Sequence, residues 1–518
     1  MMKNLRYVII PVLVLLLAAG AFGGDEAAAM DNSTLRIATL DHTQTLDPPY
    51  LNTLWNDGNI MFDIFDGLVQ YKPGTFEIEP GLATDWEISD DNREITFYLR
   101  EGVQFHGDYG EFTAEDVKFS FERIAEDDTV PDHEQFLYLE EVEVVDDYTA
   151  VLHLEEPMAQ LFTTSLPYNA GLIVSTEAVE EMGREEFVQN PIGTGPYKFE
   201  SWEEDIVLSR NENYWDQEAF VEGAPERVIY TPMSDAFARA SAVQTAEIDI
   251  AETSLDMKDM LEAEPDVDVK ITEGRGYWWI NFTADKEPMD DINLRKALRY
   301  IINPDDIIAG AFADLAERVD TMLASEYVGY WEDAPAYDVE DVGEDHIWQL
   351  LEDAGYPEGE DLELSMRTGT SDERRLTAEI VQDQLADWNI EASIETMEMG
   401  ALIDSAQEGT HHLGVDVFTT TPDPVYNTQW FQSGHHWNFF QWGSEEYDEL
   451  WQELSRTLDE DKQQEIAIEM QQILDEEALA TWLTYGAKVW GISENVEEMT
   501  IQPDNIIVIP HRTSMTEF

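Results

Sequence analysis

Few residues of this chain stand at spacings that would support covalent catalysis. The sequence has no Gly-x-Ser-x-Gly, His-Glu-x-x-His or P-loop motif, and it contains no cysteine. Gly193-x-Gly195 and Gly274-x-Gly276 lack the third glycine of a dinucleotide-binding loop. The stretch from Gly193 to Tyr197 instead indicates a turn entering a strand, where glycine permits backbone angles that other residues resist. We therefore expect neither an enzyme nor a cofactor.

The segment from Phe418 to Asn427 contains a candidate ligand group, the carboxylate of Asp423. An aspartate followed by proline is also a good helix N-cap, because proline is well suited to the first helical position. A structural cap and a ligand-binding carboxylate both remain open for Asp423.

Aromatic side chains and a histidine pair gather in the same part of the sequence. Flat aromatic faces suit sugars and apolar side chains alike, and a buried core accommodates them equally well. Imidazole is a common ligand of nickel and zinc, although histidines in a Gly-bounded loop are usually just solvated. These candidates are Tyr426, Trp430, Trp437, Trp442, Trp278 and Trp279, together with His435 and His436 as weak metal candidates.

The elements that must position these residues are mixed strands and helices. Alternation predicts strands at 35–40 and 95–100 and a further strand at 506–509. Capping signals and helical apolar spacing predict helices after Thr113, after Asp291 and after Ser444, and another apolar stripe runs over 466–474. Asn303-Pro304 is expected to end the second of these helices. The pattern indicates α/β architecture in at least two lobes, and no Pro/Gly/Ser-rich linker separates them.

The charge of the chain is extreme. Its 518 residues include 111 acidic and 28 basic residues, for a formal net charge of -83. Nucleic acid and anionic membranes are therefore excluded as partners. Because acidic residues alternate with aromatic and apolar residues along the whole chain, we interpret them as a solvated surface adapted to concentrated salt, whose self-repulsion requires counterion screening.

The N-terminus has the layout of a secretory signal. Lys3 and Arg6 precede an apolar run from Val8 to Phe22, and small residues follow. A run of about 15 residues is short for a membrane-spanning helix, which needs about 20. We expect cleavage between residues 23 and 30, no lipid anchor because the acceptor cysteine is absent, and a soluble periplasmic or extracellular protein.

Ordered motifs over the mature chain resemble the extracellular solute-binding proteins of the dipeptide, oligopeptide and nickel ABC importers. The motifs are Thr45-Leu46-Asp47-Pro48, Phe65-Asp66-Gly67-Leu68-Val69, Pro80-Gly81-Leu82-Ala83-Thr84-Asp85-Trp86, Leu99-Arg100-Glu101-Gly102-Val103, Pro191-Ile192-Gly193-Thr194-Gly195-Pro196-Tyr197, Asn213-Tyr214-Trp215 and Leu294-Arg295-Lys296-Ala297-Leu298. The resemblance implies a two-lobed periplasmic-binding-protein fold of type II, with a subdomain inserted in the first lobe. It places lobe I at 31–66, 193–275 and 485–518, the insert at 67–192 and lobe II at 276–484.

The same resemblance suggests where a ligand would bind. In the peptide binders, the segment similar to 418–427 carries an aspartate for the peptide's α-ammonium, but Thr420 stands at that position here and only Asp423-Pro424 is kept. Arg367 lies close to the arginine that holds a ligand carboxylate in dipeptide binders. Its planar fork suits that task, although an arginine in so acidic a chain also serves as a counterion. His436 is near the position of a metal-associated histidine in a nickel binder.

We therefore expect a monomeric binding component that hands its ligand to an ABC permease and ATPase. A peptide or peptide-like solute is the leading ligand class. An oligosaccharide or other neutral solute, and a nickel or metal chelate, remain alternatives. A secreted adhesive protein or a sensor is the hypothesis from another class.

Overall fold

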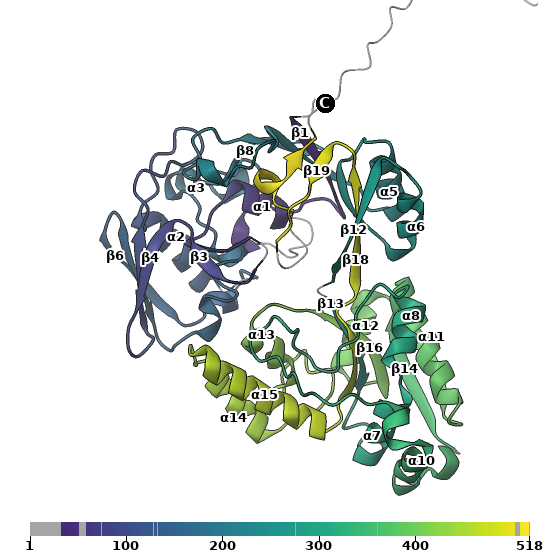
Figure 1. Ribbon diagram of the computed structural model, residues 1–518. Coiled ribbons are helices and arrows are strands. Elements are labelled where there is room, and N and C mark those ends of the chain that lie inside the picture. Colours follow the sequence, from purple (N-terminus) through teal and green to yellow (C-terminus); the bar gives the residue numbers. More distant parts are fainter. Residues whose placement is uncertain are drawn as a thin grey trace, which may run out of the picture.

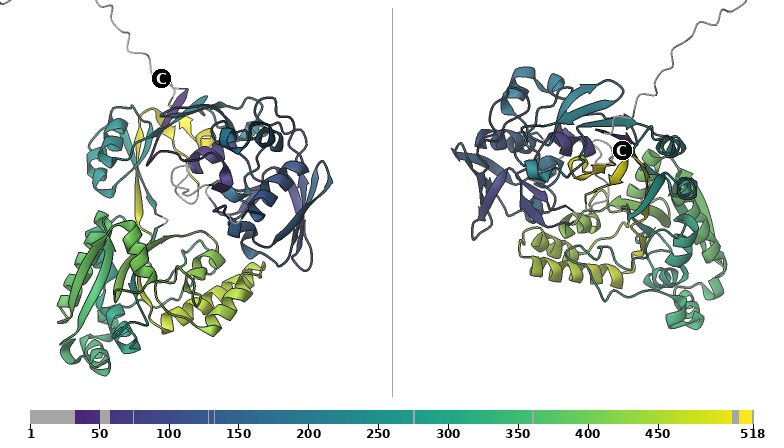
Figure 2. Two further views of the ribbon diagram at one scale, coloured as in Figure 1. Left: turned by 180° about the vertical axis from the view of Figure 1, so that it is seen from behind. Right: turned by 45° about the horizontal axis from the view of Figure 1, so that its top comes forward.

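The computed structural model describes residues 33–50, 58–73, 75–127, 129–131, 133–274, 276–359, 361–502 and 508–516. This part of the chain is organised around three sheets of seven, five and four strands, and it has two further two-stranded sheets (Figure 1, Figure 2). The predicted signal segment and residues 506 and 507 of the predicted C-terminal strand lie outside it; Val508 forms a bridge with Ile501. Within the described ranges, no helix is both long enough and apolar enough to cross a membrane.

Lobe I is the part built around a seven-stranded mixed sheet of order β12-β18-β11-β1-β10-β9-β8. β1 (Thr34–Thr39) is central and parallel to both of its neighbours, and it buries Leu35 and Ile37. The other strands are β8 (Tyr197–Trp202), β9 (Ile206–Arg210), β10 (Arg227–Pro232), β11 (Ile250–Thr253), β12 (Val267–Glu273) and β18 (Ala487–Ser493), and the pair β19 (Val496–Glu498) and β20 (Ser514–Met515) lies beside them. The helices are α1 (Asn59–Ile64), α5 (Ala236–Gln244) and α6 (Lys258–Glu262), with short 3-10 helices at Pro48–Tyr50, Gln217–Ala219, Leu255–Met257 and Pro510–Arg512.

The inserted subdomain is built around a four-stranded antiparallel sheet of order β4-β5-β7-β6. β5 (Glu94–Leu99) buries Ile95, Phe97 and Leu99, as its alternation predicts. α2 (Ala114–Ala125) begins at the predicted capping box of Thr113 and Asp116. The remaining elements are β2 (Val69–Tyr71), β3 (Ile78–Pro80), β4 (Ala83–Ile88), β6 (Leu139–Asp146), β7 (Thr149–Leu154), α3 (Thr176–Met182) and α4 (Arg184–Phe187), with 3-10 helices at His133–Phe136, Ala159–Leu161 and Asn169–Gly171.

Lobe II is built around a five-stranded sheet of order β15-β14-β16-β13-β17. Its strands are β13 (Gly276–Phe282), β14 (Glu363–Gly369), β15 (Glu391–Met397), β16 (Leu413–Thr419) and β17 (Ala480–Thr484). Its helices are α7 (Ile292–Ile301), α8 (Pro304–Ala311), α9 (Val339–Val342), α10 (Glu344–Asp353), α11 (Asp372–Ala386), α12 (Met399–Gln407), α13 (Pro424–Thr428), α14 (Glu445–Leu454) and α15 (Glu460–Glu476), with 3-10 helices at Pro357–Gly359 and Gln429–Phe431.

The predicted caps of lobe II are confirmed. Asp291 caps α7 and Ser444 caps α14 through side-chain acceptors. α7 ends at Ile301, with Ile302 as its C-cap, directly before Asn303-Pro304 as predicted. The same pair also begins α8, because the Asn303 side chain accepts from the amide of Asp305 and proline fits the first helical turn.

The glycines between residues 193 and 197 also need a correction. The turn enters β8 as predicted, but neither Gly193 nor Gly195 has a positive φ. A Cβ on Gly193 would lie 2.1 Å from the carbonyl oxygen of Ile64, and one on Gly195 would lie 2.5 Å from that of Asp63. Close approach to α1, rather than an unusual backbone angle, therefore requires glycine here.

Lobe I and lobe II are joined at two neighbouring places. β12 leads into β13 around Gly274 and Gly276, and β17 leads into β18 around Gly486. The amide of Gly274 donates to the carbonyl of Gly486 at 3.0 Å. Gly486 has a φ of +74°, a conformation that favours glycine. Figure 1 shows β12, β18 and β13 meeting on the right, and such paired short connections are suited to hinge motion.

Candidate ligand-binding site

Three cavities lie where lobe I and lobe II meet, and two of them contain predicted site residues or walls from every part of the molecule. The hinge cavity, of about 360 Å³, lies beside the crossing strands. Its lobe I wall includes residues 252–255 and Lys488, and its lobe II wall includes Trp278, Phe312 and Phe418. Lys488 Nζ lies 2.6 Å from the Glu252 carboxylate, so a buried ion pair faces three aromatic rings across this space. The volume is within the range of small-molecule sites.

The rim cavity is larger, at about 1080 Å³, and all three parts of the molecule contribute to its wall. Lobe I provides Lys270 and residues 498–502, the inserted subdomain provides residues 75–78 with Phe162 and Thr163, and lobe II provides Glu326, Val328, Pro422 and Glu460. A solute bound there could touch every part of the molecule that moves in a hinged closure.

The inserted subdomain touches lobe II directly at this rim. Glu156 and Arg456 form an ion pair at 2.5 Å, and the rings of Phe76 and Tyr327 meet edge to face with centroids 5.6 Å apart. The two sides are therefore in contact away from the hinge as well as at it.

Asp423 caps a helix of lobe II, as predicted, and also contacts the inserted subdomain. Its Oδ1 accepts from the amides of Val425 at 2.6 Å and Tyr426 at 3.2 Å, which confirms the cap of α13. Its Oδ2 accepts from the hydroxyl of Thr163, and from that of Thr164 at 3.4 Å, both in the inserted subdomain. Burial raises the pKa of Asp423, and these hydrogen bonds oppose the shift. The carboxylate thus links lobe II to the insert.

Thr420 lies next to this contact. It is buried, and its hydroxyl is 3.4 Å from that of Tyr327. A threonine hydroxyl carries no charge, so it cannot hold an ammonium as the corresponding aspartate does in the resemblance. A ligand role for Thr420 remains a prediction.

Arg367 lies in the core of lobe II. Its guanidinium donates to both carboxylate oxygens of Asp416, at 2.6 and 2.7 Å, and the two side chains are 1% and 4% exposed. Gly414 leaves room for it, because a Cβ there would lie 2.4 Å from the guanidinium carbon. The Arg367 guanidinium, which was predicted to hold a ligand carboxylate, is instead paired with the carboxylate of Asp416. A ligand role for Arg367 remains a prediction.

Phe418 brings most of the predicted aromatic residues together. Its ring centroid lies 5.1 Å from that of Trp430 and 6.0 Å from that of Trp437, and Tyr426 packs edge to face on Trp430 at 5.1 Å. Because Phe418 also lines the hinge cavity, this cluster supports one wall of it.

Of the other predicted tryptophans, Trp279 also packs edge to face on Phe418, with centroids 5.0 Å apart. Trp442 packs edge to face on Tyr447. Trp279 is 2% exposed and belongs to the core. Trp278 is the member of the predicted set that lines the hinge cavity itself.

The histidine pair shows no metal geometry. His435 and His436 stack with centroids 4.8 Å apart, His436 is exposed, and the His435 ring accepts from the Trp437 amide at 3.2 Å. Burial and the neighbouring His436 lower the pKa of His435 to about 4. Within the described ranges, no group of three or more His, Asp or Glu side chains could hold a metal ion.

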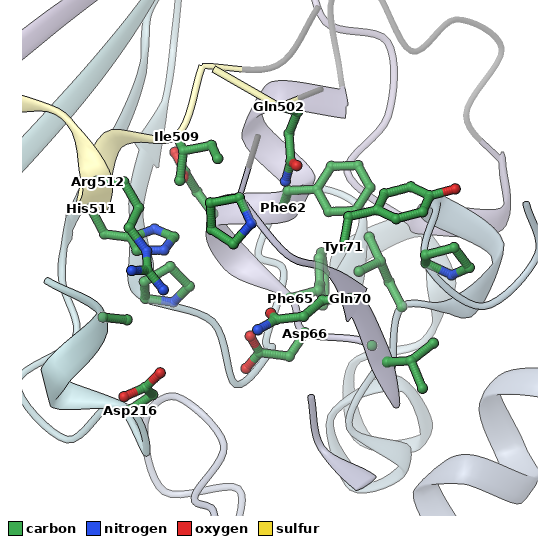
Figure 3. Close-up of a pocket in the computed structure, with 18 of the residues that line it drawn as sticks. Phe62, Phe65, Asp66, Gln70, Tyr71, Asp216, Gln502, Ile509, His511 and Arg512 are labelled. Atoms are coloured by element: carbon green, nitrogen blue, oxygen red, sulfur yellow. The ribbon is translucent and has the colours of Figure 1, made fainter. Parts of the chain in front are cut away.

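A smaller cavity of about 70 Å³ lies between lobe I and the inserted subdomain, with Asp66 in its wall (Figure 3). The Asp66 carboxylate accepts from Thr194 at 2.8 Å and from Tyr214 and Trp215 at 3.0 Å each. Burial raises its pKa. Three of the sequence motifs therefore meet at one buried carboxylate, which indicates a structural role for them.

Several residues of the interlobe walls were missed from the sequence. They include Glu252, Lys488, Lys270, Glu326 and Thr163. Each is a common residue in an ordinary local context, so no sequence signal distinguishes it.

The fold and the cavities define a two-lobed binding protein of the type II periplasmic-binding-protein class. The profile described as "Bacterial extracellular solute-binding proteins, family 5 Middle" matches residues 77–439, and the chain belongs to this family. It is 26% identical over 475 residues to a dipeptide-binding protein of Escherichia coli (strain K12), covering 85% of this chain and 87% of that protein.

Solved structures share this architecture. The structure of HbpA2 from Haemophilus parasuis superposes with a TM-score of 0.81 at 24% identity, covering 93% of this chain and 100% of that one. The ABC transporter-associated periplasmic binding protein DppA from Helicobacter pylori, in complex with the peptide STSA, gives a TM-score of 0.73 at 26% identity, with coverage of 93% and 97%.

Proposed function

We propose that this protein is the exported, monomeric substrate-binding component of an ABC importer and that it captures a peptide or peptide-like solute between lobe I and lobe II. The observation that carries the proposal is the rim cavity, whose wall combines all three parts of the molecule. The relatives of the chain include dipeptide-binding and di/tripeptide-binding proteins, which supports the ligand class.

The mechanism requires binding alone. A solute that contacts both lobes stabilises their closed arrangement in proportion to its extra affinity for that arrangement. The permease then recognises the closed form and receives the solute, and the bound ATPase drives transport. The lobe II wall of this cavity is formed by Glu326, Val328, Pro422 and Glu460. Of the residues predicted from sequence, Asp423 adjoins Pro422 and forms the contact to the insert. Thr420, Tyr426, Trp430 and Trp437 belong to the same part of lobe II but are not among these wall residues, and their ligand roles remain predictions.

The proposal is tested by titrating the purified protein with a dipeptide and tripeptide library, oligosaccharides and nickel–histidine, using calorimetry and small-angle X-ray scattering. Peptides should bind and reduce the radius of gyration, because closure compacts the molecule. Binding of a sugar or a nickel complex without any peptide response would contradict the peptide class.

A phenylalanine pair provides a matched control. Phe162→Leu removes an aromatic ring from the wall of the rim cavity and should weaken peptide binding roughly fivefold, since such a contact contributes on the order of 1 kcal/mol. Phe199→Leu makes the same change at another half-buried position, on β8, and should leave affinity unchanged.

A further inference from the structure

The charged residues around the interlobe cavities differ in whether they have partners. Among the described residues, the hinge cavity has one cation, Lys488, which pairs with Glu252. Beside the rim cavity, a third cavity of about 540 Å³ has one cation, Arg318, which pairs with Asp305, Asp320 and Asp338. The rim cavity itself has Lys270.

Lys270 is the exception among these three cations. No carboxylate of the described residues lies within ion-pair distance of its Nζ, whose hydrogen bond runs to the carbonyl of Met499 at 3.5 Å. A lysine ammonium has three donors, and this single long bond leaves most of that capacity unused. In a chain with 111 acidic residues, an ammonium without a carboxylate partner at a cavity wall needs an explanation.

The carboxylates of the rim cavity come from all three parts of the molecule. Glu326 and Glu460 of lobe II line it and are exposed, and Glu498 of lobe I and Glu77 of the insert line it as well. Lys270 is the one cation among its described lining residues. A solute with a carboxylate at one end and an ammonium at the other would therefore meet complementary charges on the two lobes. Such a solute would also draw the lobes together.

We propose that Lys270 binds the free carboxylate of the solute and so selects peptides or amino-acid derivatives with an unblocked carboxyl end. This inference rests on the proposed function and names a specificity residue for it. It gives Lys270 the task that the sequence had suggested for Arg367, whose guanidinium is held by Asp416.

The edge position of Lys270 offers a different explanation and a control. β12 is one edge of the lobe I sheet and β8 is the other, and lysines on edge strands often serve to prevent pairing with another chain. Lys198 lies on β8 and is half-buried like Lys270. Lys198→Gln therefore makes the same charge change on the same sheet without touching the interlobe cavities.

The test is calorimetric titration of wild type, Lys270→Gln and Lys198→Gln with a peptide found to bind, as its free acid and as its C-terminal amide. Wild type and Lys198→Gln should bind the acid about tenfold to a hundredfold more tightly than the amide, because only the acid can form a charge-assisted hydrogen bond with the Lys270 ammonium. Lys270→Gln should bind both forms with the weaker affinity, and circular dichroism should show it folded.

Each other outcome is decisive. Equal binding of acid and amide by wild type, or a preference that survives in Lys270→Gln, would overturn the role of Lys270 while leaving peptide binding in place. A wild-type protein that binds no peptide in either form would overturn the proposed function, and the inference with it.

Discussion

The ion pair of Arg367 and Asp416 allows a sharp test of whether a residue predicted to bind ligand is structural. The perturbation is Arg367→Met, which keeps most of the side-chain volume but removes the charge. The pair is bidentate, and both side chains are almost fully buried. Removing one member of such a pair leaves an uncompensated buried charge, which typically costs about 3 to 5 kcal/mol. We expect the free energy of unfolding to fall by about that amount.

Substituting Asp416 as well completes a double-mutant cycle for the pair. Because Arg367→Met/Asp416→Asn removes both charges of the pair, the double variant should be more stable than Arg367→Met alone. The buried Arg374 stays beside the pair in both variants and interacts with Asp416 in the single one, which reduces this difference. Arg375→Met is the matched control, since its pairs with Asp372 and Glu379 on α11 are exposed and contribute less than about 1 kcal/mol.

The assay is urea unfolding followed by circular dichroism at one fixed salt concentration, together with calorimetric titration of peptide into the folded variants. Arg367→Met should lose stability while the folded protein keeps its peptide affinity within about twofold, because the guanidinium is not offered to solvent. Unchanged stability with affinity reduced tenfold or more would refute the structural assignment and restore Arg367 as a ligand group.

Three further predictions follow from the charges of the chain. Asp423→Ala should destabilise the protein by about 2 kcal/mol, and Asp423→Asn by less, because asparagine keeps the cap and avoids the cost of a buried charge; denaturant unfolding of both variants checks this. Burial, with Glu326 and Glu317 nearby, raises the pKa of Glu273 to about 7, so its ionisation opposes folding increasingly as pH rises from about 4.5 through 7. Glu273→Gln should therefore add roughly 1 kcal/mol of stability at pH 8 after solvent screening and little at pH 4.5, and an equal gain at both values would contradict this account. Finally, dialysis to low salt should weaken the fold, since repulsion within a net charge of -83 is then unscreened; a melting temperature independent of salt would count against a salt-adapted surface.

Local signals in the sequence were sufficient for many individual elements. The alternation of Ile95, Phe97 and Leu99, the capping box at Thr113 and the Asp423-Pro424 cap all depend on residues within a few positions of one another. Such signals work because strand alternation and helix capping are short-range geometry. The ordered motifs went further and indicated the family, which the profile match now shows.

The partners of charged groups required the tertiary structure. Arg367 and Asp416 are brought together by neighbouring strands of one sheet, and Asp423 meets Thr163 although 260 residues separate them. Nothing in the local sequence says which carboxylate an arginine will find among 111 acidic residues. The composition and motifs determined that this is a strongly acidic α/β solute-binding protein. The packing of distant segments decided which charges are paired in the core and which, like Lys270, face the space between the lobes. The physical reason is that the partner of a charged group is whatever the fold places beside it.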